Sequence, residues 1–476
     1  MKYIKYLLLI IIVGCVASCS DNEPIDENEA APLLPKRELR GVWMTTVWGI
    51  DWPMGDYNAE TQKQKYIDYL DLFVEHHINA VFFQIRGMAD SFYESEYEPW
   101  SKYITGVAGQ KPDYDVLAFL IDEAHKRGIQ FHAWLNPYRI ATRASKSAAF
   151  PELDAKIPAN LVKDYETIRV YNPALPEVQT RITQIVKEII TKYDVDGIHM
   201  DDYFYPSLSS SEKMNDDAEY EMYGKDKFAS IEDFRRDNVN TVVKNIQKTI
   251  VETKPQVVFS ISPAANNDHN YNDLYADVVK WSQEGWADII IPQLYFPMGG
   301  SESSFNQRLH WWSQFTYKNA LMIGYGLYKF GDPNAGDSYQ TSDDLKKQFD
   351  FAATRPKVVG SILYSAKSLL DNKVGLMDVI KEVYQHPALP PFVGRKTVDE
   401  PSVPANVRLS GSALSWDQSS SATQYAVYKC NGVGAVADLI ALVSTTTVTL
   451  DQKGNYFVTA INRNNVESGL STLIVY

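Results

Sequence analysis

The chain has 476 residues and a formal net charge of −14 at pH 7, with 60 acidic and 46 basic side chains. An acidic chain without a cluster of Lys and Arg argues against a nucleic-acid partner, because phosphate backbones bind concentrated positive charge. The length exceeds one ordinary domain and predicts two folded units. The aromatic content of 12% suits a protein that stacks on flat apolar faces such as those of sugar rings.

The N-terminal residues are typical of a bacterial export signal. Two lysines precede an apolar run over residues 7–16, which is too short to cross a bilayer. The run ends in VASC, which resembles a lipobox, in which cleavage leaves a cysteine that carries lipid. We therefore expect residues 1–18 to be a lipoprotein signal peptide and Cys19 to be lipidated. An ordinary signal peptide with a chance cysteine near its cleavage site is the alternative.

Residues 19–36 are acidic, contain prolines and show no apolar periodicity, so we expect them to form a flexible, solvated tether. The protein would then sit on the outer membrane of the cell envelope, on its periplasmic or its surface face, and would reach the membrane through this lipid only. Cys430 would be the one cysteine left in the folded part, which provides no disulfide framework. The sequence does not indicate an oligomeric state.

Eight short apolar runs, each followed by a polar loop and a helical pattern, predict a parallel barrel. They span residues 38–48, 78–87, 129–139, 195–205, 256–264, 287–296, 321–328 and 358–367. The intervening helices are readable: residues 115–127 end at Gly128, a helix-stop residue, and apolar side chains recur on one face from Val178 to Ile189. Eight strand-and-helix units predict a closed (β/α)₈ TIM barrel over residues 37–385.

Two further segments follow the predicted barrel. Prolines cluster over residues 386–402, which predicts a flexible linker. Residues 403–476 alternate as half-buried strands with turn residues between them, a pattern that resembles a small all-β, immunoglobulin-like sandwich of the fibronectin type III kind. We expect Trp416 to lie in the core of this sandwich; a sugar-binding role for it is the alternative.

The sharpest candidate site lies in the fourth predicted strand, over residues 196–206 (DGIHMDDYFYP). Side chains alternate between the faces of a barrel strand, so His199 and Asp201 point into the mouth if Ile198 packs outward. Asp202 then lies at the turn after the strand. Adjacent carboxyl groups raise the pKa of at least one of the two, and protonation of a glycosidic oxygen needs a carboxyl group that is partly protonated near neutral pH. A loop-bracing pair and a divalent-metal site are the alternatives.

Polar residues also stand where other strands should end. They are Gln84 and Arg86 on the second strand, Asn136, Tyr138 and Arg139 on the third, and Gln293 and Tyr295 on the sixth, while His199 and Tyr203 flank the aspartate pair. A buried polar group without a partner costs about 1–3 kcal/mol, so we expect these side chains to face substrate or water. For each one alone, a structural hydrogen bond is the competing interpretation, and Arg86 could also hold Asp201 ionised.

The aspartate pair needs a partner if the two carboxyl groups do not span one bond. Adjacent residues rarely place both carboxyl groups across a glycosidic linkage, where about 5–9.5 Å must separate them. Asp90, Glu94 and Glu221, on the predicted loops, are therefore candidate proton donors, and the first two also candidate substrate-binding residues. No HExxH, GxSxG, Walker or GxGxxG motif accompanies them, so we expect neither a metal nor a cofactor.

These motifs resemble the glycosyl-hydrolase-like family 10 proteins of bacterial envelopes. The segments that carry the resemblance are LRGVWMTTVWGIDWP (39–53), NAVFFQIRGMADSFYESEYEPWS (79–101), EAHKRGIQFHAWLNPYR (123–139), VDGIHMDDYFYP (195–206), DFRRDNVN (233–240) and EGWADIIIPQLYFP (284–297). The resemblance covers the predicted barrel and implies a glycoside hydrolase fold. It implies hydrolysis of O-glycosidic bonds in peptidoglycan glycan strands or in another envelope or host polysaccharide.

One segment departs from that family pattern. Residues 262–273 (SPAANNDHNYND) stand where many relatives carry an aromatic, arginine-bearing SPFG-type segment, which leaves the substrate subsite on that side open. Two functions therefore compete: an active glycosidase with Asp201 as nucleophile or charge stabiliser, and a non-catalytic lipoprotein that binds glycan on its barrel. A mouth without a second carboxylate would favour the second.

Replacement of Cys19 by Ala tests the predicted lipid anchor. The variant should be released from membranes or remain unprocessed, because no thiol is left to carry the lipid. Membrane fractionation with mass analysis of the N-terminus measures this. Native protein that is soluble and unmodified at residue 19 would exclude the anchor.

Overall fold

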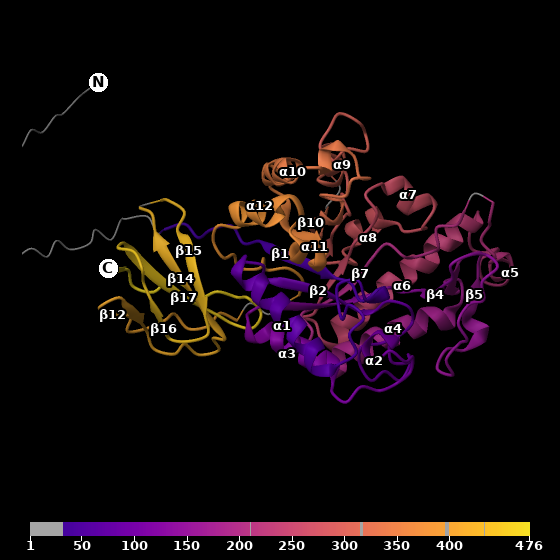
Figure 1. Ribbon diagram of the computed structural model, residues 1–476, viewed down its shortest axis with the longest axis horizontal. Helices are drawn as coiled ribbons and strands as arrows, with labels where there is room; N and C mark the ends of the chain where they lie inside the picture. Colours follow the sequence, from indigo (N-terminus) through magenta and orange to yellow (C-terminus); the bar gives the residue numbers. More distant parts are fainter. Residues whose placement is uncertain (1–31, 210, 315–317, 396–398, 433) are drawn as a thin grey trace, which may run out of the picture.

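The computed structural model describes residues 32–209, 211–314, 318–395, 399–432 and 434–476. The predicted signal peptide and Cys19 lie outside the described residues. Eight parallel strands close into a barrel in the order β1-β11-β10-β9-β8-β7-β3-β2, which confirms the predicted TIM barrel (Figure 1). The strands are β1 Leu39–Met44, β2 Ala80–Arg86, β3 Gln130–Leu135, β7 Gly197–Met200, β8 Val258–Ile261, β9 Ile289–Ile290, β10 Ala320–Gly326 and β11 Val358–Tyr364.

Helices cover the outside of the barrel, and short ones lie in the loops that follow the strands. They are α1 Ala59–Glu75, α2 Lys102–Thr105, α3 Val116–Lys126, α4 Pro176–Lys192, α5 Asp217–Glu219, α6 Ile231–Thr253, α7 Asn267–Asn272, α8 Val278–Glu284, α9 Phe305–Trp312, α10 Asp343–Ala353, α11 Ala366–Asp371 and α12 Leu376–Val383. The ends of α3 follow from local chemistry. The Asp115 side chain accepts a hydrogen bond from the Ala118 amide at the start, and Gly128 takes a left-handed φ of 70° just past the end.

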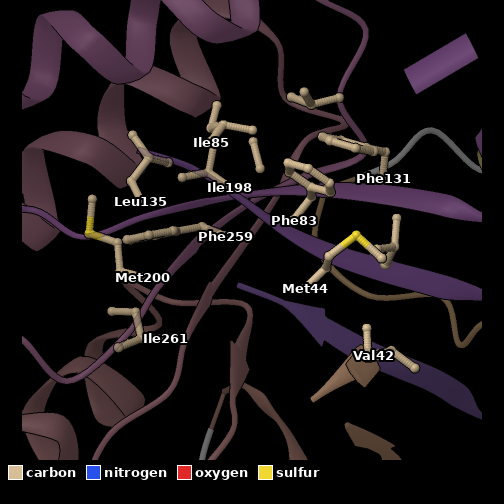
Figure 2. Close-up of a cluster of buried hydrophobic side chains, with 14 of the residues drawn as sticks. Val42, Met44, Phe83, Ile85, Phe131, Leu135, Ile198, Met200, Phe259 and Ile261 are labelled. Atoms are coloured by element: carbon tan, nitrogen blue, oxygen red, sulfur yellow. The ribbon is translucent and has the colours of Figure 1, made fainter. Parts of the chain in front are cut away.

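Alternation along the strands separates two cores. Figure 2 shows part of the outer core, in which residues such as Phe83, Ile198 and Met200 point away from the barrel axis toward the helices. The inner core holds the residues in between, among them Phe82 and Trp134. The predicted orientation of the fourth barrel strand is therefore confirmed: Ile198 faces outward, and the residues on either side of Met200 face inward.

The three longest loops follow β2, β3 and β7 and lie at the carboxyl end of the barrel strands. The loop after β3 folds into a small antiparallel sheet that the sequence did not indicate, with strands β4 (Arg139–Thr142), β5 (Val162–Asp164) and β6 (Ile168–Tyr171). This sheet and α5 lie at one end of the molecule, and the C-terminal sheets lie at the other (Figure 1). Loops at the carboxyl end build the active sites of TIM barrels.

Two antiparallel sheets form the C-terminal unit, which confirms a separate all-β region. One sheet contains β12 (Arg408–Ser410), β13 (Ala413–Ser415) and β16 (Thr447–Thr449); the other contains β14 (Gln424–Cys430), β15 (Asp438–Val443), β17 (Asn455–Ile461) and β18 (Ile474–Val475). Trp416 is 2% exposed and packs edge-on against Tyr425. It is therefore a core residue, as predicted. The assignment to the fibronectin type III kind stays a prediction.

The proline-rich segment after the barrel differs from the flexible linker that its composition predicted. The Leu389 carbonyl accepts a hydrogen bond from the Glu38 amide, and the Leu389 side chain packs on Phe457 and Ile461 of the second C-terminal sheet. Arg395 forms an ion pair with Asp288, at the amino end of β9. Ala388 and Leu389 are therefore packed, although prolines are frequent around them.

The end of the predicted tether is also packed. The Leu33 amide donates to the Ala435 carbonyl, and the Leu33 carbonyl accepts from the Ala437 amide, so this residue pairs with the C-terminal unit. Arg37 continues the contact through an ion pair with Glu467. In the part of the chain that the structure describes, no helix combines the length and the apolar character that a membrane span requires.

Replacement of Leu389 by Ala tests whether the segment joins the two units. The side chain is 5% exposed, and its removal should lower the free energy of unfolding by about 2–3 kcal/mol because a cavity remains. Urea denaturation followed by fluorescence measures the change. Leu473→Ala, at a side chain that is 45% exposed, is the control and should change the free energy by less than about 0.5 kcal/mol. Equal effects of the two variants would contradict the packed junction.

Candidate active site

A cavity of about 690 Å³ opens at the carboxyl end of the barrel strands. Its wall takes residues from the carboxyl ends of all eight barrel strands and from the loops that follow them. The lining residues on which the site depends are Trp43, Thr45, Trp48, Gln84, Trp134, Arg139, Asp201, Asp202, Tyr203, Gln293, Tyr295, Tyr328, Tyr364 and Asp371. The structure therefore brings both aspartates together with five of the predicted binding residues.

Asp201 lies at the inner wall of the cavity and is 4% exposed. Its Oδ2 accepts a hydrogen bond of 3.0 Å from Trp134 Nε1, and the Tyr203 amide approaches Oδ1 at 3.4 Å. Burial, together with the negative charge of Asp202, raises the pKa of Asp201 to about 7, although the Arg139 charge opposes this shift. Asp201 therefore changes protonation close to neutral pH.

Asp202 lies at the junction of three depressions. It lines the main cavity, a second cavity of about 670 Å³ and a third of about 180 Å³. Burial raises its pKa as well, while a hydrogen bond with Gln293 acts in the opposite direction. A ligand that occupies more than one of these depressions would pass beside Asp202. A carboxyl group with a raised pKa at this point can protonate such a ligand.

The second cavity extends the site toward β8. The two cavities share Asp202, Gln293, Tyr295 and Tyr328, and the far wall of the second belongs to residues 264–273. That wall contains α7, and it is formed by the segment that departs from the family pattern. The departure therefore falls on a surface that borders the site.

Arg139 and Tyr203 form one side of the mouth. The Arg139 guanidinium lies 4.4 Å from the centre of the Tyr203 ring, and its Nε donates to the Gly87 carbonyl at 3.1 Å. Asn136 helps to hold the Arg139 backbone in place, because its Oδ1 accepts a hydrogen bond from the Arg139 amide. Arg139 is thus held beside the aspartate pair, where its charge favours their ionised forms.

Gln84 supports the loop after β1. Its Oε1 accepts hydrogen bonds from the Thr46 and Val47 amides at 3.1 Å and 2.9 Å, so this predicted binding residue also has a structural role. On the opposite side, Gln293 donates to the Ser262 carbonyl at 3.1 Å. Tyr295 stacks on Tyr364 with a ring separation of 5.9 Å. Each of the two predicted glutamines therefore lines the cavity and braces its wall.

His199 points into the barrel, as predicted, but it is fully buried and does not line the cavity. Trp43 Nε1, which can only donate, lies 2.9 Å from His199 Nε2, so this nitrogen accepts and Nδ1 carries the proton toward Ser260 Oγ at 2.8 Å. Burial lowers the pKa of His199 well below its ordinary value. His199 is therefore neutral and holds Trp43 in place, which differs from the predicted contact with substrate.

Arg86 does not hold Asp201 ionised, which corrects one interpretation of its role. Its guanidinium pairs with Glu98 Oε1 at 3.0 Å and donates to the Asn136 carbonyl, and it is absent from the cavity wall. Tyr138 and the Asn136 side chain are likewise fully buried outside the cavity. Arg86 braces the loops after β2 and β3, because Glu98, in the first of those loops, supplies its counter-charge.

The three loop acids proposed as proton donors lie away from the cavity. Asp90 accepts a hydrogen bond from the Met88 amide, Glu94 pairs with Lys111, and Glu221 pairs with Lys225. Among the described residues, the further acid that lines the main cavity is Asp371, which pairs with Lys367 at 2.5 Å. None of the three loop acids lines the cavity, since their side chains project to solvent or bond within their own loop. A role for them as proton donors stays a prediction.

Sequence reasoning missed the aromatic wall and Asp371. Trp43 and Trp134 stand on inward-facing strand positions, so alternation could have identified them. Tyr328 follows β10, Tyr364 is the last residue of β11 and Asp371 is the last residue of α11. In the part of the chain that the structure describes, no three or more His, Cys, Asp or Glu side chains gather as a metal site requires.

Comparisons with known proteins identify the family of the chain. The profile described as "Glycosyl hydrolase-like 10" matches residues 38–341. The protein named "Glycosyl hydrolase YngK" of Bacillus subtilis (strain 168) is 36% identical, over 91% of this chain and 92% of its own. The chain belongs to the glycosyl hydrolase-like 10 family. The resemblance that the sequence motifs indicated is thereby confirmed.

Two further proteins are similar to this glycosyl hydrolase-like 10 protein. "Glycosyl hydrolase DigH" of Escherichia coli (strain K12) is 36% identical, over 75% of this chain and 91% of its own. The solved glycoside hydrolase domain of PgaB (BpsB) from Bordetella bronchiseptica is 11% identical, over 73% of this chain and 98% of that domain, with a TM-score of 0.48. The barrel assignment itself rests on the strand pairing.

The raised pKa of Asp201 predicts a pH dependence of stability. Its folded pKa of about 7 lies above the ordinary value of 3.8, so the folded protein keeps a proton that the unfolded chain loses as pH rises. Burial of the charge therefore destabilises the wild type progressively between pH 4 and pH 7. Asp201→Asn escapes this cost. Its free energy of unfolding relative to wild type should rise by about 2 kcal/mol from pH 5 to pH 8.

Urea denaturation at several pH values measures this difference. Asp226→Asn, at an exposed acid, is the matched control and should follow the wild-type profile. If the two variants show the same pH profile, Asp201 does not carry the raised pKa.

Proposed function

We propose that this protein hydrolyses O-glycosidic bonds in a glycan chain and that the Asp201-Asp202 pair is its reactive centre. The observation that carries the proposal is the position of Asp202, where three depressions of the barrel mouth meet. A chain that lies across this point places a linkage between two sugar units beside the carboxyl group. Membership of a glycosyl hydrolase-like family supports the same chemistry.

The two carboxyl groups take different roles in this proposal. Asp202 is the proton donor for the glycosidic oxygen, because it borders all three depressions of the barrel mouth and burial raises its pKa. Asp201 lies deeper against Trp134 and, once ionised, stabilises the oxocarbenium-like charge or attacks it as nucleophile. The negative charge of Asp202 raises the pKa of Asp201 to about 7, so in this proposal the two carboxyl groups share a proton close to neutral pH, and Asp202 receives it when Asp201 ionises.

The proposed substrate is a glycan strand of the cell envelope, with peptidoglycan strands as the first to test. Aromatic side chains around the cavity, among them Tyr203, Tyr328 and Tyr364, provide flat surfaces for sugar rings. We also propose that the protein acts from the outer membrane through a lipid on Cys19, so that its substrate is a polymer that the tethered barrel can reach. The protein needs no cofactor for the proposed hydrolysis.

One observation favours a second candidate, a glycan-binding protein without catalysis. The loop acids Glu94 and Glu221 lie outside the mouth, and Asp371 is engaged by Lys367. If Asp201 and Asp202 cannot act together across one bond, the same cavity would hold a glycan without cleaving it. Catalytic measurements on the aspartate variants separate the two functions.

Replacement of Asp202 by Asn tests the proposal. The variant keeps the shape of the side chain but has no proton to donate, so turnover should fall by at least about 100-fold with little change in binding. Asp201→Asn should also lower turnover. The measurement is the rate of release of fragments from purified peptidoglycan and common polysaccharides, identified by mass.

Glu221→Gln is the matched control, because it removes a loop carboxylate outside the cavity; it should keep wild-type turnover. Wild-type rates for both aspartate variants would move the catalytic assignment elsewhere. Binding of a glycan by the wild type without release of any fragment would favour the second candidate.

A further inference from the structure

We propose that the Trp48 indole is a sugar-binding platform at the end of the cleft opposite α7, where it stacks on a pyranose ring distant from the cleaved bond. The inference rests on the proposed hydrolysis and deepens it, because it names the residue that makes the reaction depend on chain length. Trp48 lines the main cavity and is nevertheless 58% exposed.

The position of Trp48 follows from the order of the strands. In the ring β1-β11-β10-β9-β8-β7-β3-β2, β1 and β8 stand opposite each other. Trp48 belongs to the loop after β1 and borders the main cavity, whereas the second cavity is walled by the segment after β8. The cleft therefore crosses the mouth, with Trp48 at one end, α7 at the other and Asp202 between them.

The backbone conformation of Trp48 is energetically unfavourable. Its φ of 57° and ψ of 11° lie in the left-handed region, which an aromatic residue adopts at a cost of about 1–2 kcal/mol. The surrounding loop imposes this geometry: the Thr45 amide donates to buried Asp51 at 2.7 Å, and the Gly49 amide donates to the Thr46 carbonyl at 2.8 Å. A strained residue that its surroundings hold in place is characteristic of binding sites.

Within the described parts of the chain, the Trp48 side chain has no partner that explains its placement. Among the described residues, no aromatic ring or cation stacks on the indole, and its N–H donates to no protein acceptor. The other cavity tryptophans differ, because Trp43 donates to His199 and Trp134 to Asp201. A rigid loop thus presents an unused aromatic face and an unused donor to the cavity, which suits the apolar face and the hydroxyl groups of a sugar ring.

The test uses peptide-free peptidoglycan glycan strands separated by length and the full-length protein with Trp48 replaced by Gly. Glycine fits the left-handed φ, so the melting temperature should not fall, and lost activity cannot be attributed to unfolding. On long strands kcat/KM should fall by about tenfold, mainly through KM, because stacking contributes to binding. On the shortest strands that the protein cleaves, kcat/KM should change by less than about twofold. Tyr57→Ala, at an aromatic residue that is 54% exposed outside this cavity, is the matched control.

Calorimetric binding of the same strands to Asp202→Asn, with and without Trp48→Gly, provides a second measurement. Weaker binding of long strands by the double variant supports the platform, even if the wild type cleaves no strand and the hydrolase proposal fails. Equal cleavage and equal binding with and without Trp48 overturn the platform while the hydrolase stands. Absence of both cleavage and binding in the wild type overturns both proposals for this substrate.

Discussion

Burial of two adjacent carboxyl groups at the barrel mouth is the constraint on which the rest of the site depends. Alternation along β7 sends Ile198 and Met200 into the outer core and leaves Asp201 facing inward, where water is scarce. The Trp134 N–H and the Arg139 charge compensate for part of the desolvation, and the remainder raises the pKa. Apolar side chains in the same positions would make the barrel more stable. The carboxyl pair therefore lowers stability, and a functional role accounts for its presence.

The two ends of the barrel have different roles: one bears the candidate site, and the other contacts the C-terminal sheets. At the carboxyl end, the loops after β1, β7, β9 and β10 supply Trp48, Tyr203, Tyr295 and Tyr328 to the aromatic wall. Buried groups such as His199 and Asp51 fix residues of the same end. At the amino end, the segment around Leu389 and the C-terminal sheets close the other side of the molecule. Movement at that junction therefore need not disturb the geometry around Asp202, because a closed sheet separates the two ends.

The accuracy of the sequence predictions follows the range of the interactions involved. All eight strands, the ends of α3 and the inward direction of Asp201 depend on alternation, helix periodicity and caps, which nearby residues determine. The misassigned residues depend on distant partners. Arg86 bonds to Glu98 in place of Asp201, and Leu389 packs on Phe457, which lies in a different folded unit. Composition marked the segment around Leu389 as a linker because prolines indicate irregular backbone, whether or not that backbone is packed.

The sequence by itself determined the barrel, the aspartate pair and its place at a strand end, since a β-strand has a period of two wherever it lies. Only the tertiary structure decided which polar residues reach the cavity. Side chains in long loops follow no period, so the outward position of Glu94 and the exposed position of Trp48 depend on how the loops pack around the mouth. The pKa of Asp201 was likewise a tertiary property, because the burial that raises it is produced by residues from several strands.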